Sequence, residues 1–271
     1  MVTEKANITN YFPRNWDCSD PKAVIVLVHG LGEHSGRYQA IGNYFIENGY
    51  ALMSIDLPGH GKSSGKRGHI DNFSDFTTAI EHLHSLAKNK HPDKPIFLLG
   101  HSLGGLISTL LLLDKQHLFS GALLSGAAIQ TPNEPSQWQI KIFTMISLLA
   151  PKMGLIKLAF SGISRDENEI QKYERDPLVN KGKLSARLLV EMFNTMRICK
   201  RRAYEITLPI KIMHGSADTM TAPAGSQYLY DQITSSDKTL NIYKGLYHEI
   251  FNEPEANKIY AEIIDWLNKR V

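Results

Sequence analysis

The sequence predicts an α/β fold in which helices flank a mostly parallel central sheet on both faces, with an inserted helical cap. Short apolar runs typical of buried strands alternate with longer segments of helical character. The run at 24–28, VIVLV, is apolar and mostly β-branched, as expected for a strand buried on both faces. With 271 residues, 42% of them hydrophobic, the chain is long enough for a single domain over 1–271 that carries such an insertion.

The expected elements follow one another in a regular order. Residues 3–16 can add antiparallel edge strands. Further strands are expected near 24–28, 51–55, 96–100, 121–125, 209–214 and 239–243. Helices are expected near 37–48, near 73–89, directly after residue 102, and over about 254–270, where Ile259, Ile263, Ile264 and Leu267 share one face.

The cap is expected over approximately 128–208. About eighty residues separate the strand near 121–125 from the next one, far more than one crossover helix needs. The stretch 140–160 is rich in Ile, Leu, Met and Phe, but three lysines and Pro151 interrupt it, so we do not expect a membrane-spanning helix. Two interpretations remain open. One is a helix pair packed on the core, and the other is an apolar lid that lines an acyl tunnel and touches lipid.

Ser102 is the candidate nucleophile. It lies in GHSLG (100–104), between an apolar strand and the start of a helix. A G-x-S-x-G turn in that context lifts a serine hydroxyl to the top of a sheet, where a base and a substrate carbonyl can both reach it. The alternative is a serine that only caps a helix N-terminus.

Asp218 and His248 complete a candidate triad. In this architecture the acid and the histidine follow the serine, each on a loop after a later strand, as these two residues do. An imidazole with an ordinary pKa of about 6.5 can take the Ser102 proton and return it to the leaving alcohol. Asp218 would hold the imidazole tautomer. Taken singly, Asp218 could be a turn residue and His248 a surface histidine.

The candidate oxyanion hole consists of two backbone N–H groups. The strand at 24–28 ends in the glycine-bracketed loop HGLG (29–32), which can aim the N–H of Leu31 at the anion. The N–H of Leu103, at the start of the helix after the nucleophile, would be the second donor. The same loop would also serve as a tight strand-to-helix turn.

Five motifs together resemble the monoacylglycerol lipase and lysophospholipase branch of the α/β-hydrolases. They are HGLGEHSGRY (29–38), DLPGHGKSSG (56–65), GHSLGG (100–105), HGSAD (214–218) and YHE (247–249). The resemblance spans nearly the whole chain and is weakest over about 128–208. It implies the α/β-hydrolase fold, the triad Ser102, Asp218 and His248, and the oxyanion hole Leu31 and Leu103. It also makes Asp56, a rival acid after the strand at 51–55, part of a structural turn.

The resemblance further implies head-group contacts. In that family a Glu and an Arg of EHSGRY and a Tyr of the cap lie near the glycerol, and Glu33, Arg37 and Tyr173 match them here. Glu33 and Arg37 could equally form a structural pair. Animal members place a histidine three residues after the catalytic one, where this chain has Phe251, and a cysteine close after the triad acid, where it has Thr221.

The remaining histidines and cysteines suggest no further chemistry. We interpret His101 as packing or support for the site, with its side chain pointing away from that of Ser102, and His29 and His214 as structural. No cluster has metal-ligand spacing, no phosphate-binding loop is present, and the fold calls for no cofactor. Cys18 and Cys199 fit no redox or metal spacing and are expected to be ordinary thiols.

Charge and the N-terminal sequence limit the partners and the compartment. A formal net charge of +3 is too small to indicate nucleic acid binding, and it favours contact with anionic membranes only weakly. Residues 1–16 carry charges and no apolar core region, so we expect no signal peptide and a cytoplasmic protein, with transient membrane contact through the cap as a further hypothesis.

These observations predict a serine ester hydrolase that cleaves monoacylglycerol to fatty acid and glycerol through an acyl-enzyme. A lysophospholipase or a broad carboxylesterase is the alternative enzyme. A catalytically silent lipid-binding protein on the same fold is the alternative from another class.

Overall fold

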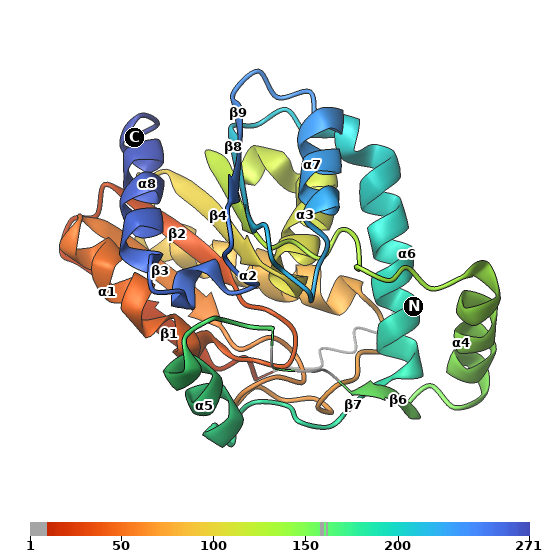
Figure 1. The fold of residues 1–271 in the computed structure, drawn as a ribbon. Helices are drawn as coiled ribbons and strands as arrows, with labels where there is room; N and C mark the ends of the chain where they lie inside the picture. The colour runs from red at the N-terminus through yellow and green to blue at the C-terminus, as the bar shows by residue number, and fades with distance from the viewer. Residues whose placement is uncertain (1–9, 158–159, 161) are drawn as a thin grey trace, which may run out of the picture.

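The computed structural model describes residues 10–157, 160 and 162–271. Within these residues seven strands form one sheet in the order β1-β3-β2-β4-β5-β8-β9 (Figure 1). They are β1 (Pro13–Trp16), β2 (Ala23–Val28), β3 (Tyr50–Ile55), β4 (Ile96–His101), β5 (Gly121–Ser125), β8 (Ile210–Gly215) and β9 (Lys238–Tyr243). β1 pairs antiparallel with β3, and every other pairing in this sheet is parallel. The expected edge strand is therefore β1, while residues 3–9 lie outside the described residues.

Helices cover both faces of the sheet. Val24, Val26 and Val28 of β2 pack in one core with α2 (Ser74–Lys90) and α3 (Leu103–Lys115). The alternate residues Ile25 and Leu27 pack in a second core with α1 (Gln39–Glu47) and α8 (Ala256–Asn268). The helix α7 (Pro223–Gln232) lies on the first of these faces. The predicted fold class is confirmed, and β2 is buried on both sides because each face of the sheet carries its own core.

The long segment between β5 and β8 contains three helices and a two-stranded antiparallel sheet. These are α4 (Gln137–Leu149), β6 (Gly154–Lys157), α5 (Glu167–Arg175), β7 (Lys183–Ser185) and α6 (Ala186–Arg202). We call the two strands the β6–β7 hairpin, although α5 lies between them in the sequence. β6 and β7 pair antiparallel, α6 packs on the sheet-covering helix α3, and α4 packs on α6 at the periphery (Figure 1). The apolar stretch 140–160 thus includes most of α4, a turn at Pro151 and the strand β6.

Short 3-10 helices occur at turns and helix ends. They span Ser35–Tyr38, Gln116–Leu118, Ala203–Glu205 and Ile250–Asn252. Among the residues that the structure describes, no helix combines the length and the apolar character that a membrane crossing requires.

Candidate active site

Ser102 occupies a strained turn at the carboxyl end of β4. Its φ of 54° and ψ of −118° make it the one non-glycine with positive φ among the described residues. A Cβ on Gly104 would lie 2.0 Å from the carbonyl oxygen of Val28, so this turn requires glycine there. The Ser102 side chain makes no capping hydrogen bond to α3. The hydroxyl is therefore not used as a helix cap, and the backbone is strained at this residue.

His248 and Asp218 lie in contact on loops that follow β9 and β8. His248 Nδ1 is 2.6 Å from Asp218 Oδ2. The other carboxylate oxygen, Oδ1, accepts from the backbone N–H groups of Met220 at 2.7 Å and Thr221 at 3.0 Å. The aspartate is thus fixed by its own loop and presents one oxygen to the histidine.

Two further side chains contact the same oxygen of Asp218, and sequence reasoning did not assign them this place. His214 Nε2 lies 2.9 Å from Asp218 Oδ2, and Thr221 Oγ1 donates to that oxygen at 2.8 Å. The other nitrogen of His214 is held by Ser226 Oγ at 2.7 Å. We interpreted His214 only as structural. The spacing of four residues in HGSAD is the signal that could have linked it to Asp218.

Burial and neighbouring groups shift the pKa values of Asp218, His248 and His101. Burial alone would raise the pKa of Asp218, but hydrogen bonds from His214 and His248 outweigh it and hold the pKa well below its usual range. For His248, burial acts to lower the pKa, and the hydrogen bond and charge of Asp218 raise it above the ordinary value. Burial, aided by the neighbouring His248, lowers the pKa of His101 to about 4. His101 is therefore neutral at neutral pH.

His101 packs against the candidate base. Its ring centroid lies 4.8 Å from that of His248, and its Nδ1 lies 3.2 Å from Ser125 Oγ.

Asp56, the rival acid, is engaged by a turn. Its Oδ1 accepts from the backbone N–H and the hydroxyl of Ser35 at 2.9 and 2.6 Å. Its Oδ2 accepts from the backbone N–H of Lys62 at 2.8 Å. Both oxygens thus hold the loops after β2 and β3 together.

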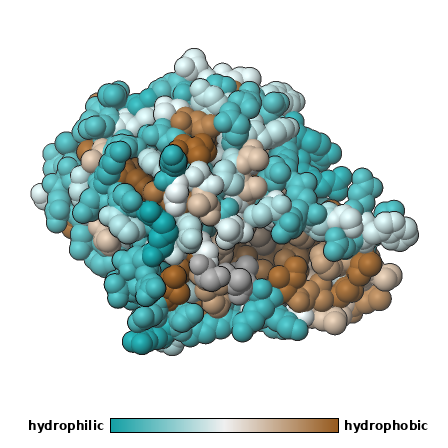
Figure 2. Space-filling view, viewed as in Figure 1, coloured by the Kyte–Doolittle hydropathy of each residue, from teal (hydrophilic) through white to brown (hydrophobic). Residues whose placement is uncertain are grey.

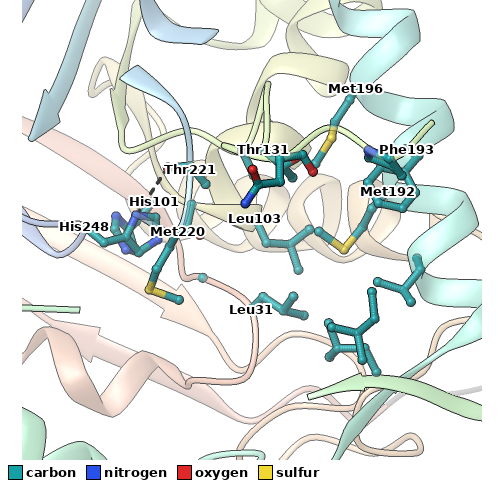
Figure 3. Close-up of a pocket in the computed structure, with 18 of the residues that line it drawn as sticks. Leu31, His101, Leu103, Thr131, Met192, Phe193, Met196, Met220, Thr221 and His248 are labelled. Carbon is teal, nitrogen blue, oxygen red and sulfur yellow. Dashed lines mark hydrogen bonds between the residues drawn. The ribbon is translucent and has the colours of Figure 1, made fainter. Parts of the chain in front are cut away.

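The two candidate oxyanion donors line the same cavity as the candidate nucleophile Ser102. Leu31 and Leu103 both line the cavity that contains Ser102 and His248 (Figure 3). Leu103 is the first residue of α3, so its N–H has no partner within the helix. A Cβ on Gly30 would lie 3.2 Å from Ser102 Cβ, so glycine lets this loop approach the serine closely.

Glu33, Arg37 and Tyr173 lie together in a buried ionic cluster that also includes Glu249. Arg37 Nη1 is 2.9 Å from Glu33 Oε2, and its Nη1 and Nη2 lie 2.5 and 2.7 Å from the oxygens of Glu249. The Tyr173 ring lies 4.4 Å from the guanidinium carbon. Glu33 Oε1 accepts from the backbone N–H of Gly30 at 2.6 Å. Glu249, which sequence reasoning did not single out, directly follows His248, and that adjacency was the available signal.

The members of this ionic cluster differ in whether they line the cavity that contains Ser102. Glu33, Tyr173 and Glu249 line it, whereas Arg37 is not among its lining residues and pairs with both carboxylates from behind.

The cavity extends from the serine between the core and the insertion. Its volume is about 390 Å³, within the range of small-molecule sites. Away from Ser102 its lining is mostly apolar and comes from α4, the β6–β7 hairpin and α6 (Figure 3): Phe143, Ile156, Leu184, Leu189, Met192, Phe193 and Met196. Polar residues that the sequence did not predict also line the cavity: Thr131, Asn133, Glu134 and Gln139. A chain-like apolar group with a polar end fits this lining.

No metal site emerges from the described part of the chain, in which no three His, Cys, Asp or Glu residues are placed to hold an ion.

Comparison with known proteins identifies the family. A family model described as serine aminopeptidase S33 matches residues 19–255. A monoacylglycerol lipase of Mycolicibacterium smegmatis is 34% identical over 249 residues, which are 92% of this chain and 89% of that protein. A monoglyceride lipase of Mus musculus is 34% identical over 265 residues, covering 96% of this chain and 87% of the relative.

A solved structure of similar fold supports the same family. The monoacylglycerol lipase of Paleococcus ferrophilus superposes with a TM-score of 0.86 at 30% identity, covering 97% of this chain and 100% of that one. The chain belongs to the serine aminopeptidase S33 family, and within the α/β-hydrolases it is a monoacylglycerol lipase-like ester hydrolase.

Proposed function

We propose that this protein hydrolyses monoacylglycerols to fatty acid and glycerol, with Ser102, His248 and Asp218 as its catalytic triad. The observation that carries the proposal is a single cavity that joins the strained Ser102 turn and the His248–Asp218 pair to an apolar tunnel. A tunnel of this size suits one acyl chain. Medium or long monoacylglycerols are therefore expected to be better substrates than triacylglycerols.

The proposed mechanism proceeds through an acyl-enzyme. His248 accepts the Ser102 proton as the serine oxygen attacks the ester carbon, and the N–H groups of Leu31 and Leu103 stabilise the oxyanion. Collapse of this intermediate breaks the ester bond, and His248 gives the proton to the departing glycerol. Water, deprotonated by His248, then attacks the acyl-enzyme and releases the fatty acid and Ser102. Asp218 holds the tautomer and stabilises the imidazolium.

The proposed head-group contacts are Glu33 and Tyr173, with Arg37 holding Glu33 in place. Both side chains line the cavity near Ser102 and can bind glycerol hydroxyls. Two hydroxyl bonds retained in the transition state correspond to a preference of about tenfold to a hundredfold over a methyl ester of the same acid. Phe251, which offers no polar group, argues for the lower end of that range.

One observation favours a lysophospholipase as the second candidate. Glu33 and Glu249 share a single guanidinium, so this end of the cavity carries an excess of negative charge that suits a cationic head group.

We further propose that the exposed apolar side chains of α4, Trp138, Met145, Leu148 and Leu149, touch lipid when the enzyme collects its substrate (Figure 2).

One experiment tests the activity and its nucleophile. A fluorophosphonate probe should label the wild type and not Ser102→Ala, which should also lose ester hydrolysis while its circular dichroism stays unchanged. A wild type that does not react would favour the silent lipid-binding protein, and full activity in Ser102→Ala would remove Ser102 from the mechanism.

A substrate panel then distinguishes the head groups. We would measure kcat/KM for monoacylglycerol, lysophosphatidylcholine and methyl ester with one acyl chain, and for triacylglycerol at a comparable interface. Truncation of Glu33 or Tyr173 should erase the monoacylglycerol preference while methyl ester hydrolysis persists. A lysophosphatidylcholine optimum would select the second candidate, and a flat profile would indicate a general carboxylesterase.

A further inference from the structure

Three segments that are distant in sequence meet on one face and carry only positive charge. Lys66 Nζ lies 3.4 Å from the carbonyl oxygen of Lys152, and Ser185 donates its backbone N–H to the oxygen of Gly68 at 2.8 Å. These contacts bring together 57–70, 135–157 and 177–190, which contain nine Lys and Arg and no Asp or Glu. Because the whole chain has a formal charge of +3, the remaining residues sum to −6. These three segments therefore carry nine of the thirty Lys and Arg of the chain and no carboxylate side chain of their own.

The acidic residues at the borders of these segments are already engaged. Asp71 lies 3.1 Å from His69 Nε2, and Asp176 lies 2.8 Å from His34 Nε2. Glu134 pairs with Lys200 at 2.8 Å, and Glu191 accepts from the backbone N–H of Phe73 at 2.9 Å. None of these carboxylates neutralises the lysines of the β6–β7 hairpin.

Within the hairpin two lysines lie directly opposite each other. Lys157 of β6 and Lys183 of β7 are cross-strand partners, and both are exposed. Like charges in that position destabilise a strand pair. Lys152 and Lys181 are also exposed, and among the ion pairs of the described residues none involves these four lysines. An anionic partner outside the chain would relieve the repulsion.

Exposed apolar side chains adjoin the same lysines. Met153 and Ile156 of this region are 52% and 39% exposed, and Leu148 and Leu149 at the end of α4 are 72% and 82% exposed. In Figure 2 brown residues gather on the right, where Figure 1 places α4 and β6. Ile156 also lines the catalytic cavity. The positive charge, the apolar surface and the cavity wall therefore meet at one place.

We propose that this face binds anionic phospholipid bilayers. Lys152, Lys157, Lys181 and Lys183 contact the lipid head groups while Leu148, Leu149 and Met153 enter the acyl boundary. This proposal extends the contact between α4 and lipid proposed above. The role of bilayer binding in substrate capture rests on the proposed hydrolysis of lipid esters. A bilayer with anionic lipid supplies both the charge and the apolar depth that the face presents, whereas a soluble polyanion would leave the leucines in water.

Vesicle binding tests the proposal independently of turnover. Sedimentation with the full chain would compare vesicles of phosphatidylcholine with vesicles containing about 30% phosphatidylglycerol, which have a negative surface potential. The wild type should bind the anionic vesicles more tightly, and the preference should fade between about 0.1 M and 1 M salt as screening shortens from about 10 to 3 Å. Lys157→Gln/Lys183→Gln should lower the affinity for anionic vesicles about twenty-five-fold, roughly five-fold for each lysine.

A matched variant controls for net charge. Lys244→Gln/Lys258→Gln removes two exposed lysines outside the three segments, and it should retain the full preference. A second hairpin variant, Lys152→Gln/Lys181→Gln, covers the case in which the first fails to fold. Hydrolysis of a soluble short-chain ester should be unchanged in all three, so a failed binding result is distinguishable from a failed enzymatic assignment.

Three outcomes would overturn the proposal. They are equal wild-type binding to both vesicle types, an unchanged preference in the folded hairpin variants, and an equal loss in the control variant. Retention on heparin without any vesicle binding would assign the face to a soluble polyanion instead.

Discussion

The two halves of the insertion between β5 and β8 are attached to the molecule in opposite ways. The α5 segment (162–180) is joined to both the loop that carries Gly32 and the loop that carries Glu249: the backbone N–H of Glu249 donates to Ile163 O at 2.7 Å, and that of Asn180 donates to Gly32 O at 2.8 Å. The α4 arm (135–157) packs on α6 and leaves its apolar side chains exposed. One half is therefore built to hold the site, and the other is free to meet a partner.

Arg37 is the centre of the α5 attachment. Its guanidinium pairs with Glu33 on the oxyanion loop and with Glu249 beside His248, and the Tyr173 ring of α5 covers it. Burial opposes the charge of Arg37, but the two carboxylates outweigh that effect and hold its pKa well above the usual value. No comparable link joins the described residues of α4 to either of these two loops.

The largest expected effect comes from removing this centre. Arg37→Met leaves two buried carboxylates without a cation, so the free energy of unfolding should fall by about 3–5 kcal/mol. Denaturant unfolding measures it. The control, on α5 itself, is Lys172→Met, which breaks the exposed Lys172–Glu169 pair and should cost less than about 1 kcal/mol. If the two variants lost equal stability, α5 would not be anchored through Arg37.

The next effect concerns the α4 arm. Leu148→Ser/Leu149→Ser should leave the stability and the turnover of a soluble ester unchanged, because both side chains are exposed. Hydrolysis of substrate in vesicles should fall by about tenfold to a hundredfold, since each leucine loses roughly 1 kcal/mol or more of burial in lipid. If the double variant kept the wild-type rate on substrate in vesicles as well as on the soluble ester, α4 would not contact lipid.

The sequence predicted the fold, but it did not predict the contrast between the anchored α5 segment and the exposed α4 arm. Apolar runs bounded by turn residues placed the sheet strands β2 to β5, β8 and β9 to within about two residues, because strand burial is a local pattern. GHSLG predicted a tight turn at Ser102, and its positive φ agrees. Apolar content in 140–160 did not reveal which side of α4 faces the core or that β6 and β7 pair.

Contacts across long stretches of sequence were also beyond prediction. Arg37 meets Glu249 across 212 positions, and His34 meets Asp176 across 142. Such pairs depend on how finished loops pack, which no periodicity encodes. The roles of Ser102, Asp218 and His248 remain predictions that their geometry supports.

A smaller effect should appear in the pH profile. His248 must be neutral to act as a base, and its raised pKa places the acid limb of kcat/KM above about pH 6.5. Glu249 is one of the charges that raise this pKa. Glu249→Gln should therefore shift the limb to lower pH, measured with a soluble ester, while Leu148→Ser/Leu149→Ser leaves it in place. An upward shift in Glu249→Gln would contradict the assignment of His248 as the base.

The smallest expected effect tests a peripheral attachment of the α5 segment, the contact between Asp176 and His34. Burial acts to raise the pKa of Asp176, but the hydrogen bond with His34 and the backbone N–H of Leu178 outweigh it and lower the pKa. A carboxylate with a lowered pKa adds stability that is present above its unfolded pKa of about 3.9 and is lost as the pH falls through the folded pKa. Asp176→Asn should therefore cost less than about 1 kcal/mol at pH 7, because the carboxylate is partly exposed.

The difference in free energy of unfolding between variant and wild type should depend on pH for this contact and not for a lysine of the α4 arm. Denaturant unfolding between pH 7 and pH 3 should show the gap between Asp176→Asn and wild type beginning to close toward the acid end, since the wild-type carboxyl takes up a proton in the unfolded state before it does so in the folded state. Lys141→Met on α4, where the lysine is exposed above Trp138, should show no such closing. A gap that stays constant with pH would mean that Asp176 holds α5 through its shape and its bond to Leu178 rather than through its charge.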